Sequence, residues 1–144
     1  MSEQNKALVR RTIEEIWNKG NLAVADELIA PNHVAHDPAN PNPGSGPEVT
    51  KQQASMYRTA FPDLHMTIED QVAEGDQVVT RWTATGTHRG DLMGIAPTGK
   101  QMTITGINIS RIAGGKAQED WTNWDTIGMM QQLGAVPQVA AARG

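Results

Sequence analysis

Five side chains stand out as candidates for proton-transfer chemistry: His33, His36, Arg81, Asp120 and Asp125. Histidine exchanges a proton near neutral pH, and a carboxylate in an apolar surrounding resists ionisation and becomes a usable general base. An arginine in the middle of an alternating strand must be paired or must bind a ligand, because burying an unpaired charge is costly. These residue types therefore predict acid/base chemistry.

Other kinds of site find less support in the sequence. The chain has no cysteine, which excludes disulfides, cysteine zinc sites and thiol nucleophiles. A metal held by His33 and His36 would need carboxylates that the sequence does not place nearby. The glycine-rich segment 90–99 lacks the Gly-Lys-Ser/Thr ending of a phosphate-binding loop, and no dinucleotide motif follows a strand. We therefore expect activity without a metal or a redox cofactor.

Composition narrows the class of protein. The 144 residues include 12 Lys and Arg against 16 Asp and Glu, for a formal net charge of −4. A nucleic-acid-binding protein normally carries a basic stripe, so that class is disfavoured. The length predicts one domain over residues 1–144, with residues 135–144 as a flexible tail. A polar N-terminus and the lack of a long apolar run predict no membrane segment and a cytoplasmic location.

The first sixty residues and the C-terminal end have helical periodicity. Val9, Ile13, Ile16 and Trp17 form one stripe of a helix that Ser2 can cap. Helices are expected over residues 2–17, 22–29 and 47–61, with a short one over 126–133. Four prolines and two glycines in residues 38–47 predict a loop before the third helix.

Strand patterns fill the second half of the chain. Alternating runs predict strands over residues 66–72, 77–88, 102–112 and 116–124, and a brief strand is expected over 33–36. This order predicts an α+β fold. Strands of this length must twist and bend, so we expect a bent antiparallel sheet of four or more strands with the helices across its concave side.

Five motifs occur along the chain in a familiar order and spacing. They are AFPDL (60–64), GDQVVTRW (75–82), GTHRG (86–90), GIAPTGK (94–100) and QQLG (131–134). On these motifs the chain resembles the SnoaL-like polyketide cyclase family from its first helix to Gly134. The resemblance implies the NTF2-like fold, a cone of bent sheet closed by helices around an apolar pocket. That fold also carries isomerases, dehydratases, epoxide hydrolases and binding proteins, so the site must decide the function.

In such a cone, side chains of one parity on each strand point into the pocket. This parity predicts pocket positions for Val79, Arg81 and Thr83, for Asn108 and Ser110, and for Gln118, Asp120, Thr122 and Trp124. Cyclases of the family are understood to use an aspartate on the last strand as the acid/base of an aldol ring closure. The matching position here is Thr122, which cannot serve, whereas Asp120 can reach the same cavity. Asp120 is either that base or a solvated or Arg81-paired residue at the rim.

The remaining polar candidates each have two interpretations. His36 stands where members of the family often have a histidine, and it either acts on a substrate carbonyl at the pocket mouth or is structural. Arg81 either pairs with Asp120 or polarises a bound carbonyl. Thr83 stands where limonene epoxide hydrolases have the aspartate of an Arg-x-Asp pair, which disfavours epoxide opening. Asp125 has the opposite parity and precedes a helix, which favours an N-cap.

Aromatic and methionine side chains supply apolar contact surface. Most of them belong to the core by default. We expect Tyr57 and Trp124 on the pocket wall, because a polyketide or terpenoid needs a stacking surface, with Trp17 and Met93 as further substrate-binding residues.

Together these features predict a cofactor-independent enzyme that acts on a hydrophobic, carbonyl-rich secondary metabolite by acid/base enolate chemistry, such as aldol-type cyclisation. Asp120 would be the base, and Arg81, Asn108 and Thr122 would bind oxygen atoms. The alternatives are hydroxylation, isomerisation or hydrolysis by a relative, or a binding protein of the same fold. Because helices cover only one face of the sheet, we expect a homodimer or higher homo-oligomer through the other face.

Overall fold

Helices make up most of the first sixty residues in a computed structural model that describes residues 2–41 and 43–135. Its helices are α1 (Ser2–Arg11), the π-helical η1 (Thr12–Asn18), η2 (Leu22–Val24), α2 (Ala25–Leu28) and α3 (Pro47–Ala60). The short α4 (Thr126–Gln132) follows the last strand. The expected flexible tail lies, from residue 136 onward, outside the described residues.

Five strands form one sheet. They are β1 (Ile29–His36), β2 (His65–Glu74), β3 (Gln77–Thr87), β4 (Gln101–Ala113) and β5 (Lys116–Trp124), in the order β1-β5-β4-β3-β2. Strands β2 to β5 pair antiparallel, whereas β1 lies parallel to β5 at the edge. The strand predicted over 33–36 has eight residues, twice the expected length. The helix before it ends at Leu28 because the chain is already extended at Ile29.

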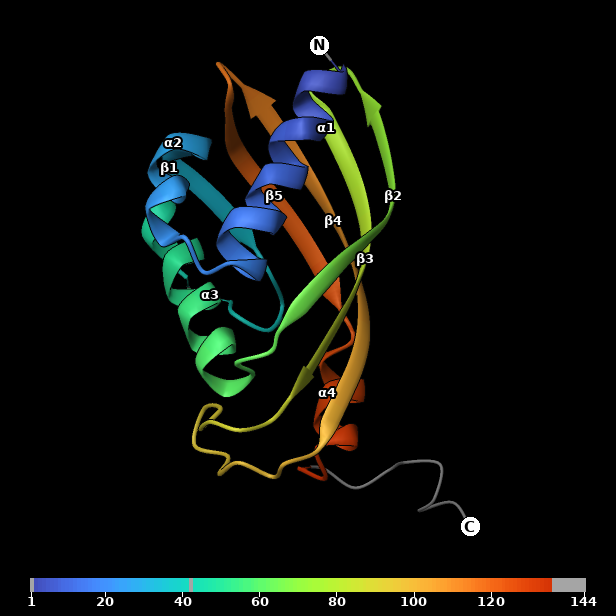
Figure 1. The fold of residues 1–144 in the computed structure, drawn as a ribbon. Helices are drawn as coiled ribbons and strands as arrows, with labels where there is room; N and C mark the ends of the chain where they lie inside the picture. The colour runs from blue at the N-terminus through green and yellow to red at the C-terminus, as the bar shows by residue number, and fades with distance from the viewer. Residues whose placement is uncertain (1, 42, 136–144) are drawn as a thin grey trace.

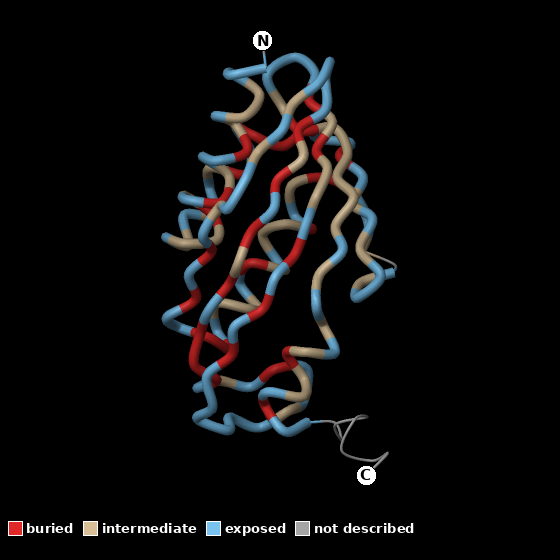
Figure 2. The backbone as a smooth tube through the Cα atoms, turned by 90° about the vertical axis from the view of Figure 1, so that its right-hand side faces the viewer, coloured by how far each residue is buried: buried red, intermediate tan, exposed pale blue. Residues whose placement is uncertain are grey.

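Figure 1 shows α1, α2 and α3 together on one side of the bent sheet, with α4 at one end of it. The predicted α+β architecture is thus confirmed. Buried and exposed residues alternate along the strands (Figure 2), as a sheet with one covered face requires. On β3 the covered residues are Val78, Thr80, Trp82 and Ala84.

A close approach between β3 and β4 shapes the covered face. Trp82 of β3 lies opposite Gly106 of β4, and a Cβ atom at Gly106 would overlap the indole ring of Trp82. Glycine therefore leaves room for a large ring where the helices close over the sheet.

The uncovered face of the sheet has an apolar row across its strands. The register places Val72, Val79, Ile109 and Trp121 side by side on β2, β3, β4 and β5, and His36 of β1 completes the row. Ile107 lies on the same face of β4, two residues before Ile109, and is 48% exposed. A face of this kind is typical of a surface that another protein surface covers.

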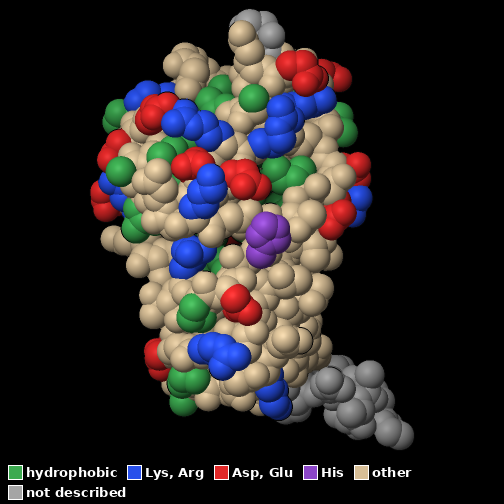
Figure 3. Space-filling model, viewed as in Figure 1, with side chains coloured by type: hydrophobic (Ala, Val, Ile, Leu, Met, Phe, Trp, Pro, Cys, Tyr) green, Lys and Arg blue, Asp and Glu red, His purple; other side chains and the backbone are tan. Residues whose placement is uncertain are grey.

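Other surfaces have mixed character. On the side seen in Figure 3, basic and acidic side chains are interspersed and no large patch of one sign stands out. Within the described residues, no helix combines the length and the apolar character needed to cross a membrane.

Candidate active site

A cavity of about 200 Å³ lies between the covered face of the sheet and the helices. Apolar and aromatic side chains from every strand and from α1, η1 and α3 make up most of its wall. The polar wall residues that the strands contribute come from β1, β4 and β5 and are His33, Asn108, Ser110, Asp120 and Thr122. The predicted inward positions of Asn108, Ser110, Asp120 and Thr122 are therefore confirmed.

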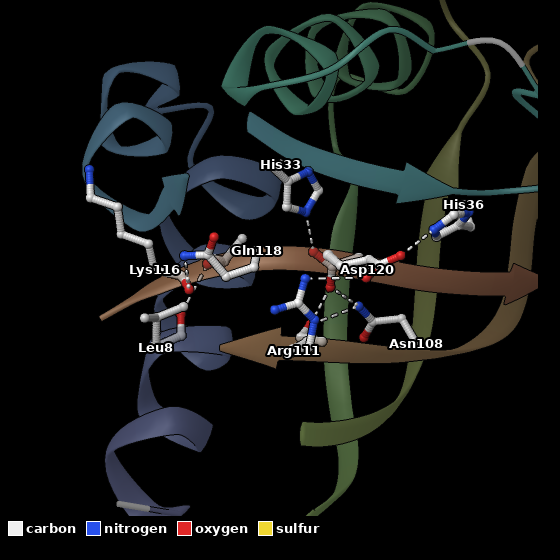
Figure 4. Close-up of polar contacts among 11 residues, drawn as sticks. Leu8, His33, His36, Asn108, Arg111, Lys116, Gln118 and Asp120 are labelled. Carbon is white, nitrogen blue, oxygen red and sulfur yellow. Dashed lines mark hydrogen bonds and ion pairs between the residues drawn. The ribbon is translucent and has the colours of Figure 1, made fainter. Parts of the chain in front are cut away.

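Asp120 is the centre of this polar wall. Its Oδ2 atom lies 2.6 Å from Nε2 of His33, and its Oδ1 atom accepts hydrogen bonds from Nδ2 of Asn108 at 3.0 Å and from the hydroxyl of Ser110. Figure 4 shows His33 of β1 and Asn108 of β4 pointing toward Asp120 of β5. The side chain of Asp120 is 20% exposed, so the carboxylate is held by three groups and still reaches the cavity.

His33 approaches this carboxylate from the parallel strand β1. The residue is only 2% exposed, and its Nδ1 atom has no hydrogen-bond partner among the described residues. A proton on Nε2 makes a charge-assisted hydrogen bond to Asp120, whereas a proton on Nδ1 would be a buried donor without an acceptor. The contacts therefore favour a proton on Nε2 of His33.

His36, and not His33, was expected to face the pocket, and this placement is wrong. Successive side chains of a strand point to opposite faces, so His33 and Ala35 face the cavity and His36 faces outward. Nε2 of His36 lies 2.6 Å from Oε2 of Glu119, and its ring stacks on Trp121 at 5.3 Å. The hydrogen bond from His36 is the main reason why the pKa of Glu119 is lowered.

Arg81 also lies on the outer face, and its predicted contact with Asp120 is wrong. The buried neighbours Thr80 and Trp82 fix the parity of β3, so Val79, Arg81 and Thr83 point away from the cavity. Nε of Arg81 donates to Oδ2 of Asp70 at 3.0 Å, with both side chains largely exposed. Arg81 therefore cannot bind an oxygen atom in the cavity.

Two further placements differ from expectation. The register shift between β4 and β5 puts Ala117 on the cavity wall, and the amide of Gln118 donates instead to backbone oxygens of Ala113 and Lys116. Met93 is 54% exposed in the loop between β3 and β4 and does not line the cavity. Met93 has a φ of 48° in a loop that backbone hydrogen bonds between Leu92 and Ile95 close. Alternation along a strand does not predict such a loop.

Tyr57 and Trp124 lie on the cavity wall as expected, whereas substrate binding by them and by Trp17 stays a prediction. Trp17, Tyr57 and Trp124 all line the cavity, with the centroid of the Tyr57 ring 6.4 Å from that of Trp17 and 5.7 Å from that of Trp124. Burial, and then the charge of Asp37, raise the pKa of Tyr57 to about 12, so its phenol is protonated at neutral pH. Asp125 is an N-cap as expected, because its side chain accepts from the backbone N–H of Gly128.

The wall residues that sequence reasoning did not place in the cavity include His33, Asp37 and Trp82. The alternation of His33 and Ala35 on β1, continued by Asp37 directly after it, was the available signal. The start of β1 had to be known to choose its parity. Asp37 accepts from Nε1 of Trp124 at 3.3 Å and from the backbone N–H of Ala39 at 2.8 Å.

Comparison with known proteins gives consistent relatives. A family model described as SnoaL-like polyketide cyclase matches residues 7–133. The aklanonic acid methyl ester cyclase DnrD of Streptomyces peucetius is 29% identical over 131 residues, covering 88% of this chain and 88% of that protein. The structure of IdmH from Streptomyces antibioticus is similar with a TM-score of 0.80 at 35% identity, covering 91% of this chain and 99% of IdmH.

A more distant structure bears on the fold alone. A Catenulispora acidiphila protein described as having a ketosteroid isomerase-like fold matches with a TM-score of 0.75 at 17% identity. It covers 90% of this chain and 93% of that one. The NTF2-like fold implied by the sequence motifs is therefore confirmed.

Proposed function

Because this chain belongs to the SnoaL-like polyketide cyclase family, we propose that it catalyses acid/base enolate chemistry on a hydrophobic, carbonyl-rich small molecule without a cofactor. Aldol-type ring closure is the reaction that this chemistry fits best. The observation that carries the proposal is the carboxylate of Asp120, which reaches an apolar cavity while three neighbouring groups contact it.

These contacts suit a base. A carboxylate accepts at about four lone-pair sites, and His33, Asn108 and Ser110 occupy three of them. The remaining site is available to a proton from a substrate in the cavity. The three contacts fix the carboxylate in one orientation, so its free lone pair is presented to the cavity.

The proposed reaction conserves all atoms. Asp120 takes a proton from the carbon next to a substrate carbonyl, and the resulting enolate carbon forms a C–C bond with a second carbonyl carbon of the same molecule. The C=O π bond of that carbonyl breaks, and the new alkoxide oxygen takes the proton back from Asp120. The carboxylate is thereby regenerated.

Hydroxyl groups on the wall are suited to the developing negative charge. Thr122 lies two residues from Asp120 on β5, and the protonated phenol of Tyr57 faces the same cavity. Hydrogen-bond donors held in place in a dry site stabilise an enolate more than the same donors do in water. Thr122 and Tyr57 take the role that the sequence had assigned in part to Arg81.

Exchange with solvent deuterium tests the proposal without knowledge of the natural substrate. We expect the protein to accelerate the exchange of the acidic protons of phenylacetone in D2O, followed by proton NMR in the presence of a chelator. An aryl ketone suits this cavity because its wall is aromatic and its base is adjacent. The expected rate is unchanged by EDTA, because the proton moves between carbon and Asp120 alone.

Two results would contradict the proposal. If exchange is no faster than in buffer for a series of aryl ketones that bind, the protein is a binding protein of the same fold. If the chelator abolishes exchange and an added metal ion restores it, the cofactor-independent mechanism is wrong. The same measurement on Asp70→Asn, an exposed aspartate on the outer face, controls for surface charge.

We also propose that the protein is a homodimer through the outer face of its sheet. The row from Val72 to Trp121 crosses the sheet on that face, and Ile107 adds exposed apolar surface beside it. Burying apolar surface is favourable by about 25 cal/mol per Å², and two copies of such a face can cover each other about a two-fold axis.

Light scattering after size exclusion tests this assembly. We expect twice the chain mass of 15.6 kDa at micromolar concentration, and a monomer for Trp121→Glu, which introduces a charge into the row. Thr85→Glu, on the same face but outside the row, should remain dimeric. A monomeric natural sequence would show that the face is not used in this way.

A further inference from the structure

One end of the cavity combines aromatic rings with a carboxylate. Trp17, Tyr57 and Trp124 form a connected set of rings, tilted at the first contact and edge to face at the second. Asp37 lies on the wall beside them and accepts a hydrogen bond from the indole N–H of Trp124. Of these four residues, the proton transfer by Asp120 uses only Tyr57, through its hydroxyl group.

No described lysine or arginine on this wall balances the charge of its carboxylates. Among the described residues that line the cavity, two are aspartates, Asp37 and Asp120, and none is lysine or arginine. Asp37 forms no ion pair with a described basic residue. A carboxylate in a half-buried aromatic surrounding is costly without a positive partner. Its contribution to the raised pKa of Tyr57 shows that its charge reaches the ring.

We propose that this end of the cavity is a subsite for a cationic amine, formed by Asp37 with the rings of Trp17, Tyr57 and Trp124. Aromatic faces attract ammonium groups through their quadrupole, most strongly when the cation is desolvated. A carboxylate beside the rings adds a direct charge interaction. An alkylated ammonium fits such a cage because its methyl groups contact the rings while its charge faces Asp37.

This proposal rests on the proposed function and specifies its substrate. Ala35 is the register partner of Asp120, and Asp37 is two residues further along the chain, about 7 Å at the rise of roughly 3.3 Å per residue of an extended strand. The substrate would therefore be a carbonyl compound that carries an amine several atoms away from its acidic carbon. A free carboxylate would meet two like charges in the cavity, so any acid group of the substrate must be esterified or amidated before it binds.

Titration of tryptophan fluorescence with three molecules of the same shape tests the subsite. Choline carries the cation, 3,3-dimethylbutan-1-ol is its neutral isostere, and 3,3-dimethylbutyrate is an anion of similar shape. We expect choline to bind at least tenfold more tightly than the alcohol, and the butyrate to bind more weakly than either. Equal affinities of choline and the alcohol in the natural sequence would overturn the proposal without any variant.

Single substitutions test which residues cause the preference for choline. Asp37→Asn should weaken choline binding about tenfold and leave the affinity for the neutral alcohol unchanged, and Tyr57→Leu should weaken choline more than the alcohol. The matched control Asp70→Asn, which removes an equal charge from the outer face, should change neither. If Asp70→Asn weakens choline as much as Asp37→Asn does, the attraction is that of the net negative charge, and the subsite is refuted.

The outcome is separable from that of the proposed function. Asp120→Asn should retain the preference for choline over the alcohol, since Asp37 and the rings remain. Choline preference without proton exchange on any ketone would leave the subsite standing and remove the enzyme. Proton exchange without a preference for choline would support the enzyme and refute the subsite.

Discussion

Asp120→Asn is expected to lower turnover about 10²–10⁴-fold, while the affinity for the ketone changes little. The amide has the shape of the carboxylate but cannot accept the proton. Ser110 and Asn108 hold Oδ1 of Asp120, so the new amide nitrogen would face His33. The ring of His33 can carry its proton on Nδ1 instead and accept from the amide at Nε2. That change leaves a buried donor at Nδ1 and costs about 1–3 kcal/mol.

Rate and thermal stability must be measured on the same variant. The loss of turnover is calculated per folded molecule, from the rate of deuterium exchange and the fraction folded at the assay temperature. The matched variant Asp70→Asn should keep both the rate and the stability. An Asp120→Asn protein that retains more than a tenth of the exchange rate would show that the proton goes elsewhere, and Asp37 would be the next carboxylate to test.

The sequence was sufficient for the fold because its patterns are local. Alternation along residues 77–88 and 102–112 predicts strands wherever they pair, and the stripe from Val9 to Trp17 predicts a helix that covers them. The parallel pairing of β1 with β5 is different. It joins His33 to Asp120 across 87 positions of the chain, and no pattern within either strand specifies such a partner.

The errors in the site come from parity. A shift of one residue exchanges the two faces of a strand, so Arg81 was expected inside although Trp82 beside it takes the cavity position. For the same reason His36 was expected at the cavity, where the structure has His33. On β5 the parity from Asp120 to Trp124 was correct, and it fails only at Gln118, beyond the register shift. Irregularities of this kind depend on how two strands pair and not on either strand alone.

His33→Leu is expected to lower the turnover number about 10- to 150-fold, with a much smaller change in KM. Leucine removes the donor to Oδ2 of Asp120, and a hydrogen bond to a charged group contributes about 1.5–3 kcal/mol. His33 does not touch the substrate in this mechanism. It positions the carboxylate, and because its Nδ1 has no partner in the described part of the chain, it is not placed to pass a proton onward.

His33→Gln decides between positioning and proton transfer. The amide nitrogen of glutamine can reach the place of Nε2 and donate to Asp120, but it cannot exchange a proton as imidazole does. If His33 only positions Asp120, the glutamine variant should recover most of the turnover that leucine loses, and its pH profile should keep the shape of the natural one. If glutamine is as slow as leucine while both melt near the natural temperature, His33 takes part in proton transfer and the positioning role is wrong. Because the neutral amide has almost the same hydrogen-bonding pattern as the Nε2-protonated ring, the comparison isolates the titratable proton from the hydrogen bond.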